Sequence, residues 1–312
     1  MKPNAIHKRC QLASTFSIVA FDPSTKDLGV AVQSRYFSVG SVVPWAEADV
    51  GAIATQSFVN VSYGPRGLQL LKKGQTVDEV INGLTQDDEA KEFRQLGIVD
   101  SRANAAAFTG KKCLEWAGSK VGKNYSIQGN ILACENVINR MADRFESSHG
   151  DLANKLVAAL DGGEEAGGDA RGRQSAALLV VRKNCGRGGY GDRYIDLRVE
   201  NHPDPIAELK CLLELHRVYR LIDESEEKLA TGNLEDALST AREAVSLNPN
   251  IDDAHVDLGI ICLKLDKREE AIKAFKEALR LNPKMKNLIT QLPKVGLIKP
   301  SPEVFGELGM YL

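Results

Sequence analysis

Thr15 is a candidate nucleophile, because it opens the apolar run TFSIVAF. A threonine hydroxyl attacks a carbonyl when the residue is the first of a mature chain, since its own α-amino group, with a pKa of about 8, then accepts the hydroxyl proton. Fourteen residues precede Thr15. The chemistry therefore requires the bond between Ser14 and Thr15 to be cut, by the protein or by a protease, or translation to start later.

A polar, glycine-rich loop, GGDARGRQS at 167–175, leads straight into the apolar run AALLVV. A loop in this position can aim polar side chains into a cleft at the end of a strand. The candidates are Asp169, Arg173, Gln174 and Ser175. The alternative is a plain turn in which Asp169 pairs with Arg171 or Arg173.

The string QGN at 128–130 precedes a predicted helix. Its backbone N–H groups and the Asn130 amide can donate hydrogen bonds to an oxyanion near the start of that helix. The alternative is that Asn130 only caps the helix. Both interpretations stay open at this point.

Other catalytic and cofactor motifs are missing from the sequence. The glycine runs lack the phosphate-loop pattern GxxxxGK[ST], and there is no GxSxG elbow for a serine nucleophile. The five histidines and six cysteines form no HExxH or CxxC pattern. We therefore expect neither a metal nor a cofactor, and the unpaired cysteines favour the reducing cytoplasm.

The composition is that of an ordinary globular protein, with 26% charged residues and a net charge of −2. Lys and Arg are spread along the chain, so we expect no nucleic-acid partner. No apolar run approaches the roughly 20 residues that cross a bilayer, so we expect no membrane partner. At 312 residues the chain is long enough for two domains.

The residue pattern in the first two thirds of the chain predicts an α+β domain. Strands are indicated by seven β-branched or apolar runs, at 16–21, 28–34, 50–58, 94–100, 104–110, 175–182 and 193–199. Two helix pairs interrupt them, at 64–84 and 131–163, with breaks near Gly74 and Gly150. Strands, helices and then strands again favour helices that cover sheets.

The last third predicts an all-helical repeat domain. NPN at 248–250 returns as NPK at 282–284, and Ala237 and Ala244 return at Ala271 and Ala278, in each case 34 residues later. This is the tetratricopeptide period, and such repeats present a concave face to a protein or peptide partner. The alternative is a packed helical appendage. We expect repeat helices at 214–231, 234–250, 251–265 and 268–284. A helix from Asp204 can cap one end of the repeats, and the tail from Lys284 to Leu312 can cap the other.

Several strings in the first domain resemble one family in the same order. They include TFSIVAFDP, VGSVVPWAEADVGAIATQ, YGPRGL, QLGIVD, QGNIL, GGDARGRQSAALLVVR and HPDPIAELKCLLELHR. The resemblance covers Thr15 to about Arg217 and is to the uncharacterised family DUF1028 of the N-terminal-nucleophile (Ntn) hydrolase superfamily. It implies a four-layer αββα sandwich with the nucleophile on the first residue of an inner strand.

For chemistry, the resemblance implies hydrolysis of an amide bond in a small molecule or a peptide. It places Thr15, Arg35, Asn130 and Asp169 in catalysis, and Gln128, Gly129, Arg173, Gln174 and Ser175 in substrate binding. Arg35 corresponds only by position to a basic residue near the nucleophile, and an exposed arginine at a strand end is the alternative. Family members commonly begin Met-Thr-Phe-Ser, whereas this chain carries the leader MKPNAIHKRCQLAS.

Together these observations divide the chain into a leader at 1–14, an Ntn-hydrolase-like domain at 15–203 and a repeat domain at 204–312. The first hypothesis is an amide hydrolase with a repeat module for a partner. The second is a scaffold that keeps the sandwich without activity, and the third is a small-molecule binding module that uses the 167–175 loop and survives loss of Thr15. Homo-oligomers are expected only by analogy with the superfamily.

Overall fold

The structure is a computed structural model that describes residues 12–13 and 15–310. The chain divides into two compact units, residues 1–212 and 213–312. Each unit is described by itself. The predicted leader lies outside the described residues except for Leu12–Ala13, and the predicted boundary between residues 203 and 204 stays a prediction.

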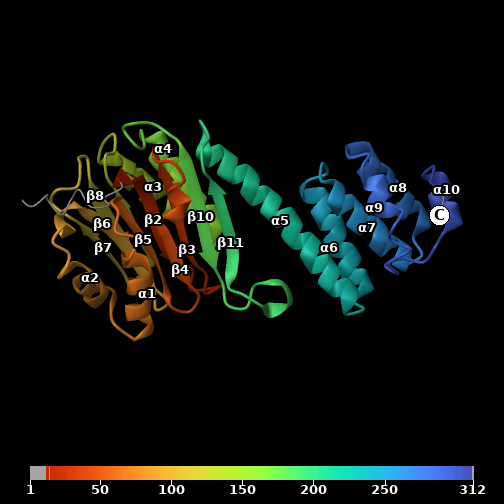
Figure 1. The fold of residues 1–312 in the computed structure, drawn as a ribbon, viewed down its shortest axis with the longest axis horizontal. Helices are drawn as coiled ribbons and strands as arrows, with labels where there is room; N and C mark the ends of the chain where they lie inside the picture. Colours follow the sequence, from red (N-terminus) through yellow and green to blue (C-terminus); the bar gives the residue numbers. More distant parts are fainter. Residues whose placement is uncertain (1–11, 14, 311–312) are drawn as a thin grey trace, which may run out of the picture. The chain divides into compact units, whose positions relative to one another are not determined.

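The first unit contains two antiparallel sheets (Figure 1). One sheet has the strand order β1-β5-β6-β7, with β4 also paired to β5. Its strands are β1 (Leu12–Ala13), β4 (Pro44–Glu47), β5 (Gly51–Phe58), β6 (Arg94–Asp100) and β7 (Ala105–Thr109). β1 belongs to the predicted leader and pairs with β5 through Leu12 opposite Phe58 and Ala13 opposite Ser57.

The second sheet has the order β11-β10-β3-β2-β9-β8. Its strands are β2 (Thr15–Phe21), β3 (Leu28–Ser34), β8 (Gly118–Gly122), β9 (Tyr125–Gly129), β10 (Ser175–Val181) and β11 (Arg193–Val199). β2 is an inner strand, with β3 on one side and β9 on the other. All seven predicted strand runs form strands, whereas β1, β4, β8 and β9 were not expected.

Helices cover the outer face of each sheet, and the breaks inside both predicted helix pairs are confirmed. α1 (Tyr63–Lys72) and α2 (Val77–Thr85) pack on Ile53, Leu96 and Ile98 of the first sheet. α3 (Asn136–Ser147) and α4 (Leu152–Glu165) lie on the second sheet. α2 begins with a capping box formed by Thr76 and Glu79, which satisfies backbone N–H groups at its start.

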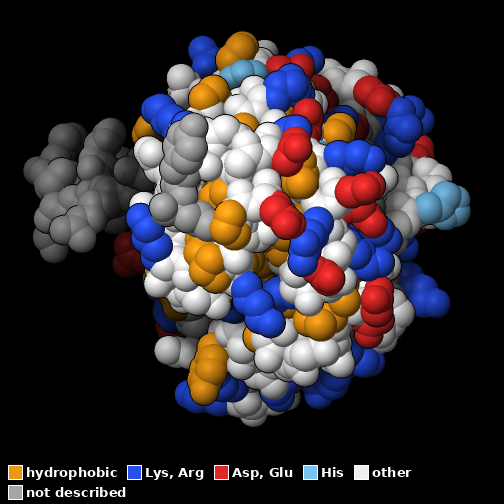
Figure 2. Space-filling model, turned by 90° about the vertical axis from the view of Figure 1, so that its right-hand side faces the viewer, with side chains coloured by type: hydrophobic (Ala, Val, Ile, Leu, Met, Phe, Trp, Pro, Cys, Tyr) orange, Lys and Arg blue, Asp and Glu red, His pale blue; other side chains and the backbone are white. Residues whose placement is uncertain are grey.

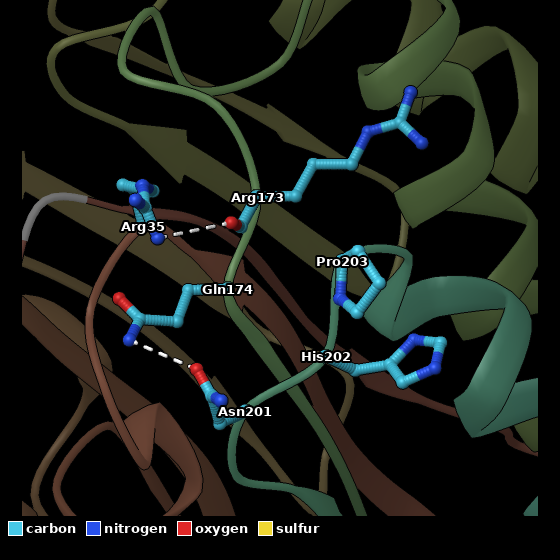
Figure 3. Close-up of a pocket in the computed structure, with 6 residues that line it drawn as sticks. All are labelled: Arg35, Arg173, Gln174, Asn201, His202 and Pro203. Atoms are coloured by element: carbon cyan, nitrogen blue, oxygen red, sulfur yellow. Dashed lines mark hydrogen bonds between the residues drawn. The ribbon is translucent and has the colours of Figure 1, made fainter.

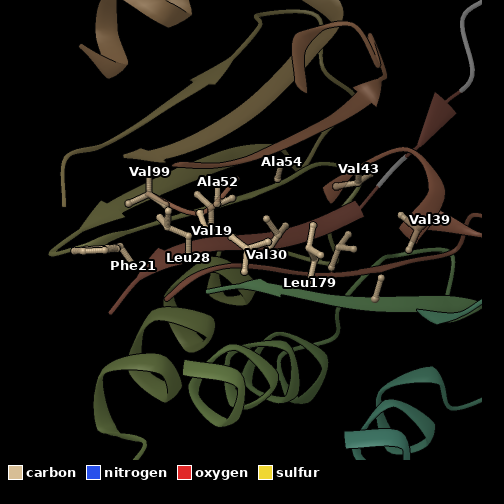
Figure 4. Close-up of a cluster of buried hydrophobic side chains, with 14 of the residues drawn as sticks. Val19, Phe21, Leu28, Val30, Val39, Val43, Ala52, Ala54, Val99 and Leu179 are labelled. Carbon is tan, nitrogen blue, oxygen red and sulfur yellow. The ribbon is translucent and has the colours of Figure 1, made fainter. Parts of the chain in front are cut away.

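The space between the sheets is apolar at one end. Figure 4 shows side chains of the second sheet facing side chains of the first, and all of them are buried: Val19, Val30 and Leu179 on one side, Ala52, Ala54 and Val99 on the other. Because side chains alternate along a strand, the residues between these ones point to the helices. The mixed α/β fold with antiparallel sheets therefore follows the sequence pattern.

The second unit is helical. α5 (Pro205–Ala230) begins in the first unit and continues into the second, where it is followed by α6 (Leu234–Leu247), α7 (Asp252–Lys264), α8 (Arg268–Leu281), α9 (Met285–Ile289) and α10 (Pro302–Glu307). The capping helix predicted from Asp204 and the repeat helix predicted at 214–231 thus form one continuous helix. A Cβ on Gly259 of α7 would lie 2.5 Å from the Phe275 ring of α8, so this close approach needs glycine.

The tail after α8 closes the end of the helical unit, as expected. Ile289, Val304 and Phe305 belong to the same buried apolar cluster as Ile261 and Phe275 of the α7–α8 pair.

Figure 2, which views the molecule from the right-hand side of Figure 1, shows Lys and Arg side chains interspersed with Asp and Glu across the described part of that face. A mixed pattern of this kind does not favour a phosphate backbone as partner.

Candidate active site

Thr15 begins β2 and is fully buried. It lies opposite Ser34, the last residue of β3, and the Thr15 and Ser34 hydroxyl oxygens are 3.5 Å apart. Its carbonyl oxygen accepts hydrogen bonds from the Asn130 backbone N–H at 3.0 Å and from Gln56 Nε2 at 3.3 Å. The position of Thr15 is therefore fixed by both sheets. Ser14, and with it the predicted cleavage bond, lies outside the described residues.

A group of buried polar side chains fills the inter-sheet space behind Thr15, and we call it the amide cluster: Ser17, Gln56, Gln95, Gln128 and Asn130. Ser17 Oγ donates to Gln56 Oε1 and accepts from Gln128 Nε2, each at 2.6 Å. Gln56 Nε2 and Asn130 Nδ2 both donate to Gln95 Oε1, at 2.8 and 2.9 Å. These bonds join β2 and β9 of one sheet to β5 and β6 of the other.

The amide cluster exists because strand positions that face the other sheet carry polar residues instead of Val or Ala. Gln95 also donates to the Gly129 carbonyl oxygen at 2.8 Å, which holds the end of β9 against β6. A Cβ on Gly97 would lie 1.8 Å from Gln128 Oε1, so only glycine leaves room for the Gln128 side chain. Buried amides are tolerated when they are hydrogen-bonded in this way.

Asp169 anchors the loop before β10. Its carboxylate is fully buried and accepts from Arg171 Nη2 at 2.8 Å, from Arg171 Nε at 3.0 Å and from the Arg35 backbone N–H at 3.0 Å. Its backbone pairs with Leu132. The pairing of Asp169 with Arg171, one of the two turn alternatives, is thus confirmed, and Asp169 connects this loop to the residue that follows β3.

Three of the expected residues line one pocket of about 520 Å³ at the end of β3. Figure 3 shows them with the segment before α5: Arg35, Arg173, Gln174, Asn201, His202 and Pro203. Gln174 donates its backbone N–H to the Ser34 carbonyl oxygen at 3.0 Å. The pocket therefore adjoins the residue that faces Thr15.

Two expected substrate-binding side chains do not reach an open surface. Gln128 is fully buried in the amide cluster, with its Oε1 accepting from Ser126 at 2.9 Å. Ser175 is fully buried as well, and its hydroxyl donates to the Tyr36 carbonyl oxygen at 2.5 Å and accepts from the Val39 N–H at 3.1 Å. In this structure both side chains hold backbone segments in place, and their role in substrate binding stays a prediction.

The QGN string also differs from expectation in its position. Gly129 ends β9, Asn130 follows it directly, and the next helix, α3, begins only at Asn136. Asn130 therefore does not cap that helix. Its backbone N–H and its side-chain amide are instead directed at Thr15 and Gln95.

Sequence reasoning missed Ser34, Gln56, Gln95, Asn201 and His202. The first three lie in predicted strands, where a polar residue reads as solvent-facing, and only the pairing of the two sheets reveals that they meet beneath Thr15. Asn201 and His202 lie in the short segment between β11 and α5.

A thiol nucleophile at this site is not favoured. Cys113 is buried, and its Sγ donates to the Arg94 carbonyl oxygen at 3.3 Å. Burial raises the pKa of the Cys113 thiol, whereas a reactive cysteine needs a lowered pKa.

Across residues 12–13 and 15–310, no group of three His, Cys, Asp or Glu side chains is placed to hold a metal ion. No helix in the same residues is long and apolar enough to cross a membrane.

Comparisons with known proteins divide the chain in the same way. A model of a family of unknown function, DUF1028, matches residues 15–209, and a tetratricopeptide repeat model matches residues 253–285. The crystal structure of a protein from Silicibacter pomeroyi that is assigned to DUF1028 is 32% identical. The match covers 65% of this chain and 85% of that one, with a TM-score of 0.60. No curated protein matches. The chain belongs to the DUF1028 family and carries a tetratricopeptide repeat in its helical unit.

Proposed function

We propose that this protein is an amide hydrolase of the N-terminal-nucleophile class, with Thr15 as the nucleophile. The observation that carries the proposal is the placement of Thr15: it opens an inner strand, its hydroxyl lies 3.5 Å from that of Ser34, and its carbonyl is held from both sheets. The two sheets with helices on their outer faces support the four-layer sandwich that this class requires.

The reaction starts once Thr15 is the first residue. The Thr15 hydroxyl attacks the amide carbonyl, and the α-amine takes the hydroxyl proton and passes it to the leaving amine. Water then attacks the resulting ester, the amine again accepts a proton, and an acid is released. Amide and water thus become acid and amine, and no co-reactant is needed.

We assign stabilisation of the oxyanion to Asn130, which lies beside Thr15 and is oriented by Gln95. The next residue, Ile131, has a φ of 52°, a left-handed conformation that is uncommon for a β-branched side chain. Strained backbone of this kind clusters at active sites, which supports a functional turn after β9. Arg35, Arg173 and Gln174 line the adjoining substrate end, and the buried Asp169 holds the loop that carries Arg173 and Gln174.

Intact-mass measurement and N-terminal sequencing of the purified full-length protein test the first step. We expect a chain that begins at Thr15, and we expect Thr15→Ala to keep its leader. Thr15→Ser is the matched control, since it retains a hydroxyl and is expected to be cut. A protein that stays intact from Met1, or a Thr15→Ala variant that is cut as readily as the parent, contradicts self-processing.

Covalent labelling tests the nucleophile without a known substrate. A small β-lactone should acylate the Thr15 hydroxyl of the processed chain, which peptide mass spectrometry locates, and Thr15→Ala should remove the label. Labelling elsewhere, or none, favours the scaffold hypothesis.

We propose a partner protein or peptide for the helical unit. The tetratricopeptide match at 253–285 supports it, because this repeat typically mediates protein–protein interaction. We also propose that the protein is located in the cytoplasm, where its cysteines would stay reduced.

A further inference from the structure

The pocket at the end of β3 has a chemistry that the hydrolase proposal alone does not specify. It is about 520 Å³, within the range of small-molecule sites. Arg35 directly follows Ser34, whose hydroxyl is 3.5 Å from that of Thr15. The pocket therefore lies one residue along the chain from the position that faces Thr15.

The other charged groups around this pocket are already neutralised. Arg173 pairs with Glu164 at 2.5 Å and with Asp204 at 3.3 Å. Arg171 pairs with the buried Asp169 at 2.8 Å. These two arginines therefore contribute little attraction for a bound anion.

Arg35 differs from them. Its side chain is exposed, and its guanidinium donates to the Arg173 carbonyl oxygen at 3.3 Å. Within the described parts of the chain, no Asp or Glu side chain forms an ion pair with it. Figure 3 shows the Arg173 side chain running away from Arg35. The pocket thus presents one positive charge without a carboxylate partner.

Neutral amides complete the wall. Gln174 Nε2 donates to Asn201 Oδ1 at 3.1 Å, which orients the Asn201 amide so that its nitrogen can donate to a ligand (Figure 3). The His202 backbone N–H donates to the Gln174 carbonyl oxygen at 2.8 Å and ties this wall to the loop before β10. A guanidinium beside an amide donor suits an ion with a single negative charge and two oxygens.

We infer that this pocket binds a carboxylate group of the substrate, so that the molecule hydrolysed is a small anionic amide. The inference rests on the proposed hydrolase for its reaction and on Arg35 for its specificity. A phosphate would also pair with a guanidinium, but its second negative charge would face no second uncompensated cation here.

Binding to the full-length protein tests the inference without turnover. The probes are glutaramate, which has an amide at one end and a carboxylate at the other, and the neutral diamide glutaramide. We expect glutaramate to bind at least ten times more tightly by titration calorimetry. Arg35→Gln should abolish this preference, and Arg35→Lys should retain part of it. The matched control is Arg66→Gln, an exposed arginine on α1, which should leave the preference unchanged.

Equal binding of the two probes, or a preference that survives in Arg35→Gln, overturns the inference. Inorganic phosphate that binds through Arg35 more tightly than glutaramate overturns the carboxylate assignment. A different result would refute the hydrolase proposal alone: glutaramate binds through Arg35, but the β-lactone does not label Thr15. Labelling of Thr15 without a preference for glutaramate refutes the carboxylate pocket alone.

Discussion

The two units of this protein bury polar side chains in different ways. In the first unit the amide cluster consists of neutral groups that donate and accept hydrogen bonds at once, and it joins two sheets. In the helical unit the carboxyl of Asp257 is buried instead: this residue is 5% exposed and is hydrogen-bonded with Ser225. Neutral amides stay satisfied at any ordinary pH, whereas a buried carboxylate costs free energy unless it is protonated.

The consequence is a difference in pH dependence. Burial raises the pKa of Asp257 to about 7, although the hydrogen bond from Ser225 opposes this rise. The folded helical unit therefore binds a proton that the unfolded chain has already lost above about pH 4. Its stability falls as pH rises from about 4 to 7, while the amide cluster contributes no such slope. The hydrogen bonds that hold Thr15 therefore do not depend on the titration of a carboxyl.

Gln56→Glu gives the largest expected effect, because it places a carboxyl inside the amide cluster. Gln56 Nε2 donates to Thr15 O, Gln95 Oε1 and Gln128 O, and an ionised glutamate can donate to none of them. We expect the free energy of unfolding to fall by about 5 kcal/mol at pH 8 and by about 2 kcal/mol at pH 5. The amide cluster would then acquire a pH dependence of the kind that Asp257 gives the helical unit.

Urea unfolding followed by tryptophan fluorescence measures this loss in the correct unit, since both tryptophans, Trp45 and Trp116, lie in the first unit. Gln86→Glu, at an exposed position after α2, is the matched control and should change stability by less than about 0.5 kcal/mol. An equal loss at pH 5 and pH 8 would show that the comparison between the units is wrong.

The same cluster explains which parts of the fold the sequence could predict. Strands such as β5 and β10 are rich in apolar residues, so their runs stood out. β9 was missed because Ser126 and Gln128 face the other sheet and break the apolar alternation. The position of Thr15 at the start of a strand, and that of the 167–175 loop before β10, could be predicted from their local residues. Gln56 and Gln95 were not, since their role depends on strands that are far apart in the sequence.

Asp257→Asn is expected to stabilise the helical unit at alkaline pH. A pKa of about 7 against the ordinary 3.8 corresponds to a cost of up to about 4 kcal/mol once the folded unit must hold the carboxylate. Asparagine removes the charge, so the gain should be about 4 kcal/mol at pH 8.5 and less than half of that, about 2 kcal/mol, at pH 5. Hydrogen exchange of peptides from α6 to α8 reports this unit separately from the sheets.

Asp266→Asn is the control for this prediction. Its carboxyl is 82% exposed, and asparagine tolerates its φ of 56°. A slowing of exchange in Asp257→Asn that is clearly larger at pH 8.5 than at pH 5, with no change in Asp266→Asn, supports the comparison. A gain of the same size at both pH values would mean that Asp257 is not the group that titrates.

Ser225→Ala gives the smallest expected effect and tests how the Asp257 carboxyl is held. Ser225 Oγ lies 2.8 Å from the Ile222 carbonyl oxygen, to which its hydroxyl donates, and it also contacts Asp257 Oδ2. When Asp257 is protonated, its own O–H donates to Ser225, so alanine should cost about 1 kcal/mol at pH 5. Because the hydroxyl also favours the carboxylate, the pKa of Asp257 should rise further in the variant, which carbon NMR of the carboxyl group measures. An unchanged or lower pKa would show that Ser225 does not stabilise the charged form and that burial alone sets the difference between the two units.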